Sequence, residues 1–178
     1  MRIIAGAKRG HRLYDFEGMD IRPTTDRVKE SMFNLIQDFV LKSRVLDLFS
    51  GSGALCFEAL SRGADFGVCI DKDPKSVAVI KKNNEALGFE NLEIKNCGAT
   101  EFLDSTKSRF SLIFLDPPYN KGFIAPIIQK IVKKNILSED GIIVLESDFS
   151  DEHGDFEGLI KFKQKKYGRS YVTVYKRG

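Results

Sequence analysis

The sequence contains few of the residues that bind metals or form disulfides. Its three cysteines, Cys56, Cys69 and Cys97, lie too far apart for a zinc-knuckle spacing, and an odd number argues against a disulfide framework. The two histidines, His11 and His153, belong to no recognisable group of catalytic residues. We therefore expect no metal site, and we interpret the cysteines as small residues of the core or of a site lining.

Long apolar runs are absent as well. No stretch approaches the length that crosses a bilayer, and the opening MRIIAGAKRG has no apolar segment of signal-peptide length before Lys8 and Arg9. There is no internal repeat and no linker. A chain of 178 residues, 42% hydrophobic and 30% charged, suits one globular domain. We expect a single domain over residues 1–178, cytoplasmic, with no membrane and no obligate protein partner.

Carboxylates are missing from both ends of the chain. The first 14 residues contain Arg2, Lys8, Arg9 and Arg12 but no acid. From residue 158 onward acids are again absent, and the cations are Lys161, Lys163, Lys165, Lys166, Arg169, Lys176 and Arg177. Such segments favour contact with a polyanion, although solvated strand faces would carry the same charges.

Strand and helix patterns alternate along the chain. Apolar residues at helical spacing follow the capping oxygens of residues 24–26, and Asp73 with Pro74 is typical of a helix start. The expected helices are about 25–41, 54–61, 74 to just before Gly88, and 123–132, and the expected strands are 44–49, 66–70, 92–95, 112–115 and 141–145, with a final β-hairpin of 159–166 and 171–176. This alternation predicts an α/β fold, in which helices cover both faces of a mainly parallel sheet and the hairpin adds an antiparallel C-terminal strand.

A glycine-rich turn, DLFSGSG at residues 47–53, follows the first predicted strand. In open α/β sheets the ligand lies beyond the carboxyl ends of the strands, and glycines let it approach backbone amides. Asp71 ends the next strand, 20 residues after Gly51, where a carboxylate can accept hydrogen bonds from ribose hydroxyls. The third glycine of a dinucleotide site is replaced by Cys56, and Asp47 would repel a pyrophosphate. We expect a nucleoside ligand with a cationic group near Asp47; a purely structural turn is the alternative.

The fourth predicted strand ends in LDPPYN, residues 115–120. Proline lacks a sheet donor and restricts the residue before it, so this stretch presents a rigid turn. The Asp116 carboxylate and the Pro117 carbonyl, held by Pro118, can accept both N–H groups of a nucleobase amine, which localises the lone pair of its nitrogen. Tyr119 can stack on the base. The hypothesis is an amine held in line with an activated methyl group; a plain strand-ending turn is the alternative.

Together these motifs resemble a known family. The chain resembles class I S-adenosylmethionine-dependent methyltransferases that act on amino groups. The residues that carry this resemblance are VLDLFSGSGALCFEALSRGA, the strand after it that ends in an acid, and LDPPY. RIIAGAKRGHRL and RPTTDRVKESMFN bring the chain closer to the bacterial RsmD family of 16S rRNA (guanine-N2)-methyltransferases, and the resemblance runs through nearly the whole chain. It implies a Rossmann-like class I methyltransferase fold with a seven-stranded sheet, S-adenosyl-L-methionine as cofactor, and 16S rRNA as substrate within a small-subunit assembly particle.

The resemblance also implies roles for individual residues. Those expected at the cofactor are Asp47, Ser50, Gly51 and Gly53 around the methionine moiety, Asp71 at the ribose, and Thr25 and Ala99. Those expected at the target amine are Asp116, Pro117, Pro118 and Tyr119. Those expected at the RNA are Arg2, Arg9, Arg12, Arg22, Arg27, Lys165, Lys166 and Arg169. Many relatives use a polar side chain for the adenine amine where this chain has Gly98, so backbone near Ala99 is expected to replace it.

Residues 22–27 have a second interpretation, because a capped helix start with surface charges would show the same pattern. The basic N-terminal extension, residues 1–23, is expected to form a β-hairpin or arm that contacts RNA. The predicted reaction is methyl transfer to the exocyclic N2 amine of one guanine in 16S rRNA, by orientation rather than by a metal or a covalent intermediate. The alternatives are a DNA adenine or cytosine amino-methyltransferase, for which 178 residues leave little room for target recognition, and a non-catalytic RNA-binding module.

Overall fold

The computed structural model describes residues 1–16, 26–117, 122, 124–148, 155–168 and 170–178. In chain order its elements are α1 (Asp26–Leu35), the 3₁₀ helix η1 (Gln37–Phe39), β1 (Arg44–Asp47), α2 (Ala54–Ser61), β2 (Phe66–Asp71), α3 (Pro74–Leu87), β3 (Leu92–Asn96), α4 (Ala99–Ser105), β4 (Phe110–Leu115), α5 (Ile124–Lys133), β5 (Leu137–Asp148), β6 (Leu159–Tyr167) and β7 (Ser170–Arg177). Strands and helices alternate up to β5, as the apolar patterns predict.

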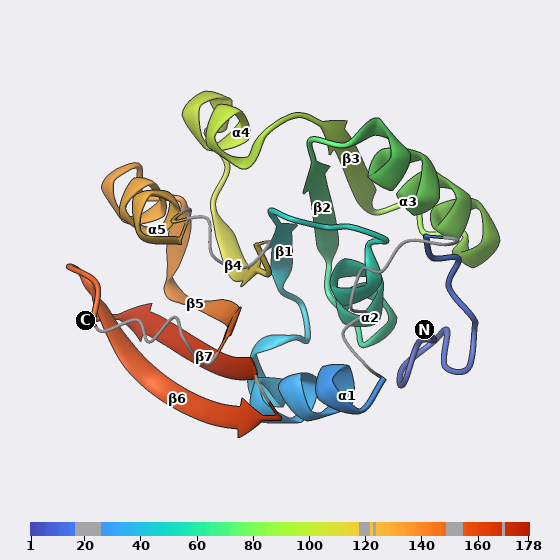
Figure 1. Cartoon of the computed structure of the whole chain (residues 1–178), viewed down its shortest axis with the longest axis horizontal. Coiled ribbons are helices and arrows are strands. Elements are labelled where there is room, and N and C mark those ends of the chain that lie inside the picture. Colours follow the sequence, from blue (N-terminus) through green and yellow to red (C-terminus); the bar gives the residue numbers. More distant parts are fainter. Residues whose placement is uncertain (17–25, 118–121, 123, 149–154, 169) are drawn as a thin grey trace.

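A seven-stranded sheet with the order β3-β2-β1-β4-β5-β7-β6 runs through the molecule (Figure 1). Strands β1 to β5 are parallel to one another, whereas β7 is antiparallel to both β5 and β6. The predicted mainly parallel sheet with an antiparallel C-terminal hairpin is therefore confirmed. The chain builds the sheet outward in one direction from β1 to β3 and in the other from β4, so the topological switch lies between β1 and β4.

Two apolar clusters cover the two faces of the sheet. Met32 and Phe33 of α1, the apolar side chains of α2, and Ile80 and Leu87 of α3 pack on one face. Phe102 and Leu103 of α4 pack with the isoleucines of α5 on the other. Figure 1 shows the same division, with α2 and α3 on one side of the sheet and α4 and α5 on the other. Helices on both faces are thus confirmed.

Some element boundaries differ from the prediction. The first helix ends at Leu35 rather than near residue 41 because Ile36, with φ −114°, leaves the helical region and the chain tightens into η1. Ile36 and Val40 are still buried, so the apolar pattern reflects the core although the α-helix stops. Helix α4 was not predicted; its seven residues follow Gly98, whose N–H donates to the Glu101 carboxylate. Strand β5 is longer than the expected 141–145.

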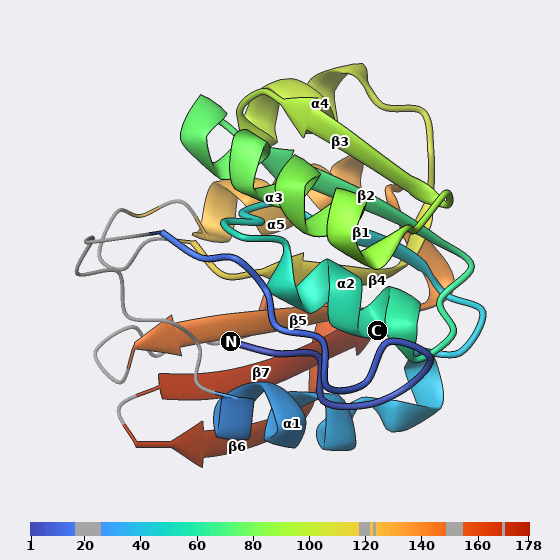
Figure 2. The same cartoon turned by 90° about the vertical axis from the view of Figure 1, so that its right-hand side faces the viewer.

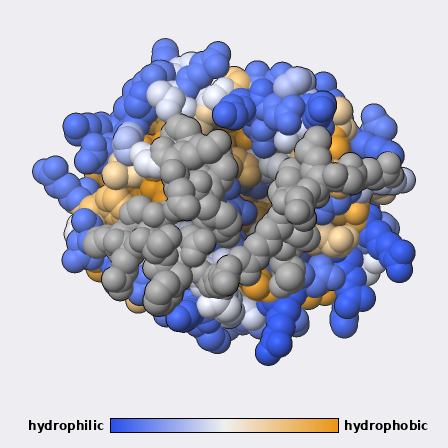
Figure 3. All heavy atoms as spheres, in the orientation of Figure 1, coloured by the Kyte–Doolittle hydropathy of each residue, from blue (hydrophilic) through white to orange (hydrophobic). Residues whose placement is uncertain are grey.

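The surface is mostly polar where the structure describes it. On the face shown in Figure 3, hydrophilic side chains form most of the rim, and hydrophobic ones are confined to patches between them. The large apolar side chains with substantial exposure among the described residues are those of Tyr14, Leu41, Ile160 and Phe162. None of the helices in this part of the chain has the length and apolar character needed to cross a membrane.

Candidate active site

The glycine loop and the start of LDPPYN leave adjacent strands at the same edge of the sheet. Asp47, the last residue of β1, pairs with Cys69 of β2 on one side and with Phe114 of β4 on the other. The loop follows Asp47 directly, and Asp116 lies two residues beyond Phe114. Neighbouring strands are about 4.8 Å apart. The topology therefore brings the two motifs together at the switch point.

Asp47 is a buried carboxylate whose oxygens lie at normal hydrogen-bond distance and angle from no donor of the described residues. It is 1% exposed, and neither oxygen has a partner among the described residues. Burial raises its pKa from 3.8 to about 7, opposed by the nearby Phe49 amide and reinforced by the Asp71 carboxylate. A buried acid in this state gains most from a cationic partner, because a positive charge stabilises the anion that burial disfavours.

The glycine loop is held in place at Ser50. Its amide donates to the Ile70 carbonyl (3.0 Å), while its hydroxyl accepts from the Ile70 amide (3.0 Å) and donates to the Asp47 carbonyl (2.8 Å). The loop then needs left-handed backbone at Gly51 (φ +53°) and Gly53 (φ +81°). A Cβ on Gly53 would lie 2.6 Å from the Phe57 ring, whereas one on Gly51 would meet no atom of the described residues within 4 Å. Among these residues Gly51 therefore faces open space that a ligand can enter.

Asp71 ends β2 and supports the loop from the side. Its carboxylate accepts hydrogen bonds from the amides of Gly51 and Asp73, each at 2.9 Å. Each carboxylate oxygen has a further lone-pair site, so the predicted ribose contact is compatible with these bonds. The next strand contributes Asn96, whose side-chain amide donates to the Asp71 carbonyl (2.9 Å), and Ala99 opens α4 shortly after it.

Half of the predicted amine-binding motif lies within the described residues. Asp116 is half-buried and Pro117 is buried, directly after the fully buried end of β4. Pro118 and Tyr119 lie outside the described residues, as do Arg22, Thr24, Thr25 and Arg169. Among the residues with described positions, no group of three or more His, Cys, Asp or Glu side chains could hold a metal ion.

The two lysines predicted on the hairpin lie at the same sheet edge as Asp116. Leu115 pairs with Leu145, Leu145 with Thr173, and Thr173 with Gln164. The next residue after Leu115 is Asp116, and the next residue after Gln164 on β6 is the exposed Lys165. One position further along are Pro117 and the exposed Lys166. Three strand spacings separate the two strands, roughly 14 Å. The hairpin therefore presents its cations beside the candidate site.

The N-terminal segment, defined here as residues 1–16, folds back on itself beside α2 (Figure 2). Arg2 and Arg12 form an antiparallel bridge, and Ile3 and Leu13 are buried in the core. Gly6 has φ +84°, and a Cβ there would lie 1.8 Å from the Ser61 carbonyl oxygen. The segment is thus packed against the domain along its length.

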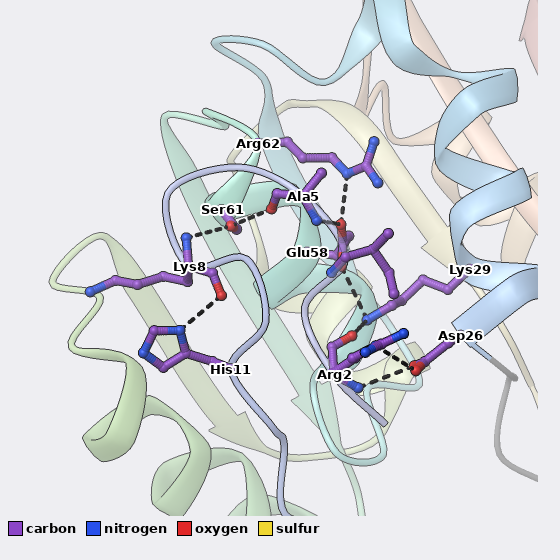
Figure 4. A network of polar contacts seen from close by, with 10 residues as sticks. Arg2, Ala5, Lys8, His11, Asp26, Lys29, Glu58, Ser61 and Arg62 are labelled. Carbon is purple, nitrogen blue, oxygen red and sulfur yellow. Dashed lines mark hydrogen bonds and ion pairs between the residues drawn. The ribbon is translucent and has the colours of Figure 1, made fainter.

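A buried ion pair anchors this segment (Figure 4). The Glu58 carboxylate of α2 accepts from the amides of Ile4 (2.8 Å) and Ala5 (3.0 Å), and it contacts Lys29 Nζ at 3.1 Å and Arg62 Nε at 2.7 Å. The side chains of Glu58 and Lys29 are fully buried. Burial lowers the pKa of Lys29, which Glu58 opposes, while the Lys29 ammonium also donates to the Arg2 carbonyl (2.6 Å). This network fixes the backbone that carries the N-terminal cations.

The predicted RNA-binding arginines lie in different places. Arg2 pairs with Asp26 at the start of α1, next to the exposed Arg27, and Arg12 is exposed opposite Arg2. Arg9 belongs to a turn whose neighbours Ala7 and Lys8 bond to Ser61, the last residue of α2. The glycine loop precedes the first residue of that helix, which is roughly 12 Å long. The structure therefore separates Arg9 from Asp116.

Two buried polar residues at this site were not predicted from the sequence. Glu58 is the one charged residue of α2, and Asn83 of α3 falls between Ile80 and Leu87 on the inner stripe. A polar residue at a core position is a usable sign of a structural or functional contact. Its partner cannot be read from the spacing, because Glu58 and Asn83 bond to residues more than 50 positions away.

Comparison with known proteins places the chain among methyltransferases. The Bacillus subtilis (strain 168) protein named "Putative rRNA methyltransferase YlbH" is 38% identical, over 99% of each chain. "Ribosomal RNA small subunit methyltransferase D" of Escherichia coli (strain K12) is 34% identical, over 83% of this chain and 75% of the relative. The solved structure "Putative methyltransferase yhhF from Escherichia coli" has a TM-score of 0.91 at 31% identity, over 99% of this chain and 97% of that chain.

These relatives confirm the resemblance seen in the sequence and the class I methyltransferase fold that it implied. A match to one family, described as conserved hypothetical protein 95, covers residues 1–176 and so includes both the N-terminal segment and the hairpin. The chain therefore belongs to the conserved hypothetical protein 95 family, and its relatives carry the names of rRNA methyltransferases.

Proposed function

We propose that the protein transfers a methyl group from S-adenosyl-L-methionine to the exocyclic N2 amine of one guanine in 16S rRNA. The observation that carries the proposal is the buried Asp47 carboxylate, which has no hydrogen-bond partner among the described residues and lies beside the space that these residues leave open at Gly51, one strand away from Asp116. Relatives named "Ribosomal RNA small subunit methyltransferase D" support the substrate. Ribosomal RNA as substrate also supports a cytoplasmic location.

The residues around the glycine loop suit this cofactor. The cofactor supplies a methyl group on a sulfonium, which is an electrophile without further activation. The Asp47 carboxylate would hold its ammonium group, and Ser50, Gly51 and Gly53 would shape the space for the methionine moiety. Asp71 would accept from the ribose hydroxyls with the lone pairs that its bonds to Gly51 and Asp73 leave available. Thr25 and the backbone near Ala99 complete the proposed contacts.

The residues after β4 would prepare the amine. An exocyclic amine is a poor nucleophile because its lone pair is delocalised into the ring. The Asp116 carboxylate and the Pro117 carbonyl would accept its two N–H groups, which localises the lone pair and orients it. The nitrogen gains a positive charge on methylation, and Asp116 would take up the proton that it releases. Pro118 would hold the Pro117 carbonyl, and Tyr119 would stack on the base.

Cations at two places would dock the RNA. Lys165 and Lys166 lie at the edge of the sheet that carries Asp116, and Arg169 stands between β6 and β7 in the sequence. Arg2, Arg12 and Arg27, with Arg22, would extend this contact past α1, and Arg9 would reach phosphates farther along the strand. Such contacts fix register and orientation but do not read the sequence. The shape of an assembling small-subunit particle would then select the nucleotide.

The experiment is methyl transfer from labelled S-adenosylmethionine to naked 16S rRNA, to partly assembled small subunits and to duplex DNA, with the modified nucleoside identified by mass spectrometry. We expect N2-methylguanosine from the RNA or the particle. The matched controls are Asp116→Ala, which should abolish most of the signal, and Asp140→Asn, an exposed acid at the far end of β5, which should not. Label in DNA alone, or in no substrate, would refute the proposal.

A further inference from the structure

The N-terminal segment has a second anchor besides Glu58, and it lies in α3. Asn83 is fully buried. Its Oδ1 accepts from the Tyr14 amide (2.7 Å), and its Nδ2 donates to the Tyr14 carbonyl (3.0 Å). These two bonds reproduce the pairing that a neighbouring strand would offer. Asn83 therefore fixes the backbone of the segment at Tyr14, whose exposed ring lies 3.8 Å from the Lys82 ammonium.

The same side chain also bonds to the glycine loop. Asn83 Nδ2 donates to the Ser52 carbonyl at 2.9 Å. Ser52 is 8% exposed and stands between Gly51 and Gly53, the two residues in left-handed backbone. Both hydrogens of the Asn83 amide are thus in use, one on each partner. One buried amide connects the basic N-terminal segment to the loop that faces the open space.

We propose that Asn83 is a positioning residue that couples the N-terminal segment to the glycine loop, so that RNA binding by the segment and S-adenosylmethionine binding by the loop strengthen each other. The inference rests on the proposed function, which assigns the cofactor to the loop and RNA to the segment. It adds a specific energetic connection between the two sites.

The coupling follows from the lack of spare hydrogen-bonding capacity. The amide plane of Asn83 cannot rotate without breaking its bond to the Tyr14 or the Ser52 carbonyl, and no solvent reaches the buried side chain to replace either bond. A cofactor that fixes Ser52 therefore fixes the orientation in which Asn83 holds Tyr14. Phosphates bound by Lys8, Arg9 and Arg12 would order the same segment from its other side. Coupling of this kind is reciprocal between the two ligands.

If Asn83 had a purely structural role, a different experimental result would be expected. Its loss would lower the stability of the protein and the affinity for each ligand, but the effect of one ligand on the other would remain. The decisive quantity is therefore the ratio of the cofactor affinities measured with and without RNA.

The test is calorimetric titration of the full chain with S-adenosylhomocysteine, alone and with naked 16S rRNA present. In the native protein we expect RNA to lower the Kd at least fivefold. In Asn83→Leu, which has similar volume but no amide, we expect that ratio to fall to about one, and the Kd without RNA to rise about tenfold because the Ser52 carbonyl is left unpaired. The control is Asn91→Leu, since Asn91 also donates to two backbone carbonyls, those of Ala64 and Asp65, away from the loop.

A native protein that binds S-adenosylhomocysteine equally well with and without RNA would overturn the coupling and leave the proposed function intact. A variant that keeps the native ratio would do the same. A native protein that binds no S-adenosylhomocysteine would overturn the proposed function itself. If Asn83→Leu does not fold, hydrogen exchange of the Tyr14 amide in the native protein decides: we expect slower exchange with S-adenosylhomocysteine bound, and an unchanged rate refutes the coupling.

Discussion

Replacing Asp47 with asparagine should stabilise the free protein while weakening its affinity for the cofactor. The carboxylate is fully buried without a hydrogen-bond partner among the described residues, and burial raises its pKa from 3.8 to about 7. An acid whose pKa is higher in the folded state binds protons more tightly there than in the unfolded chain. Its ionisation therefore destabilises the fold as the pH rises from 3.8 to 7, and the full cost remains at higher pH.

The magnitude follows from these two pKa values. At 1.36 kcal/mol for each pH unit between them, the raised pKa of Asp47 costs the folded protein about 4 kcal/mol at pH 8 and less than half of that at pH 5, where the buried group is still protonated. The Asp47→Asn variant would avoid this cost but would bury an amide with unpaired hydrogens, a penalty of about 1–3 kcal/mol that does not depend on pH. The advantage of Asp47→Asn over the native protein should therefore grow by about 3 kcal/mol between pH 5 and pH 8.

Urea unfolding of both proteins without cofactor, at pH 5 and pH 8, measures this change. The control is Asp140→Asn, an exposed acid at the opposite end of β5 from the candidate site. Calorimetry with S-adenosylhomocysteine should show affinity lowered by tenfold or more in Asp47→Asn, because a charge-assisted bond to the ammonium contributes about 1.5–3 kcal/mol. Stability curves of native and Asp47→Asn protein that run parallel from pH 5 to pH 8 would refute the reasoning.

Three further predictions concern the catalytic motif, the hairpin and the N-terminal anchor. Asp116→Ala should lower turnover at least a hundredfold and change the Kd for S-adenosylhomocysteine less than threefold; near-normal turnover in a single-turnover assay would remove Asp116 from the mechanism. Replacing Lys165, Lys166 and Arg169 with glutamine should weaken binding to 16S rRNA and reduce the dependence of log K on log salt by about two to three, with cofactor affinity unchanged; an unaltered slope in filter binding would locate the docking face elsewhere. Glu58→Gln removes the ion partner of the buried Lys29, and we expect the free energy of unfolding to fall by about 3–5 kcal/mol in urea titrations, against less than 0.5 kcal/mol for the exposed Glu85→Gln. A loss below 1 kcal/mol in Glu58→Gln would show that the pair does not anchor the segment.

Sequence reasoning succeeded where the signal is local. Helix α2 has the predicted bounds because a glycine loop starts it and Gly63 follows it closely. Helix α3 begins after Asp73, whose side chain accepts from the Lys75 amide, and it ends at Gly88 in left-handed backbone, as predicted. The mainly parallel sheet could be expected from the alternation of elements, since parallel neighbours need helical crossovers. Asp47, Ser50 and Gly51, which the resemblance assigns to the cofactor, lie at the end of β1 and in the loop that follows it.

Contacts between distant parts of the chain could not be predicted in this way. The Glu58 bonds to Ile4 and Ala5 and the Asn83 bonds to Tyr14 connect residues 53 to 69 positions apart. From the sequence, residues 1–23 were interpreted as an extension, although Ile3 and Leu13 are buried against the domain. The short α4 was missed because seven residues contain too little apolar periodicity to be distinguished from a loop.

The position of β6 at the border of the sheet gives its lysines a second task. Among the strands that the structure describes, β6 bonds to β7 alone, so β6 forms one border of the sheet over its nine residues. A long unpaired border invites a second molecule to add its own strand, and lysines along it discourage this by repulsion between like charges. The strand carries two exposed apolar side chains, Ile160 and Phe162, and each is followed directly by a lysine, Lys161 or Lys163. Two further lysines, Lys165 and Lys166, come next on the same strand. Removing these charges would leave an apolar border open to self-association, so the lysines that suit a polyanion also keep the molecules apart when none is bound.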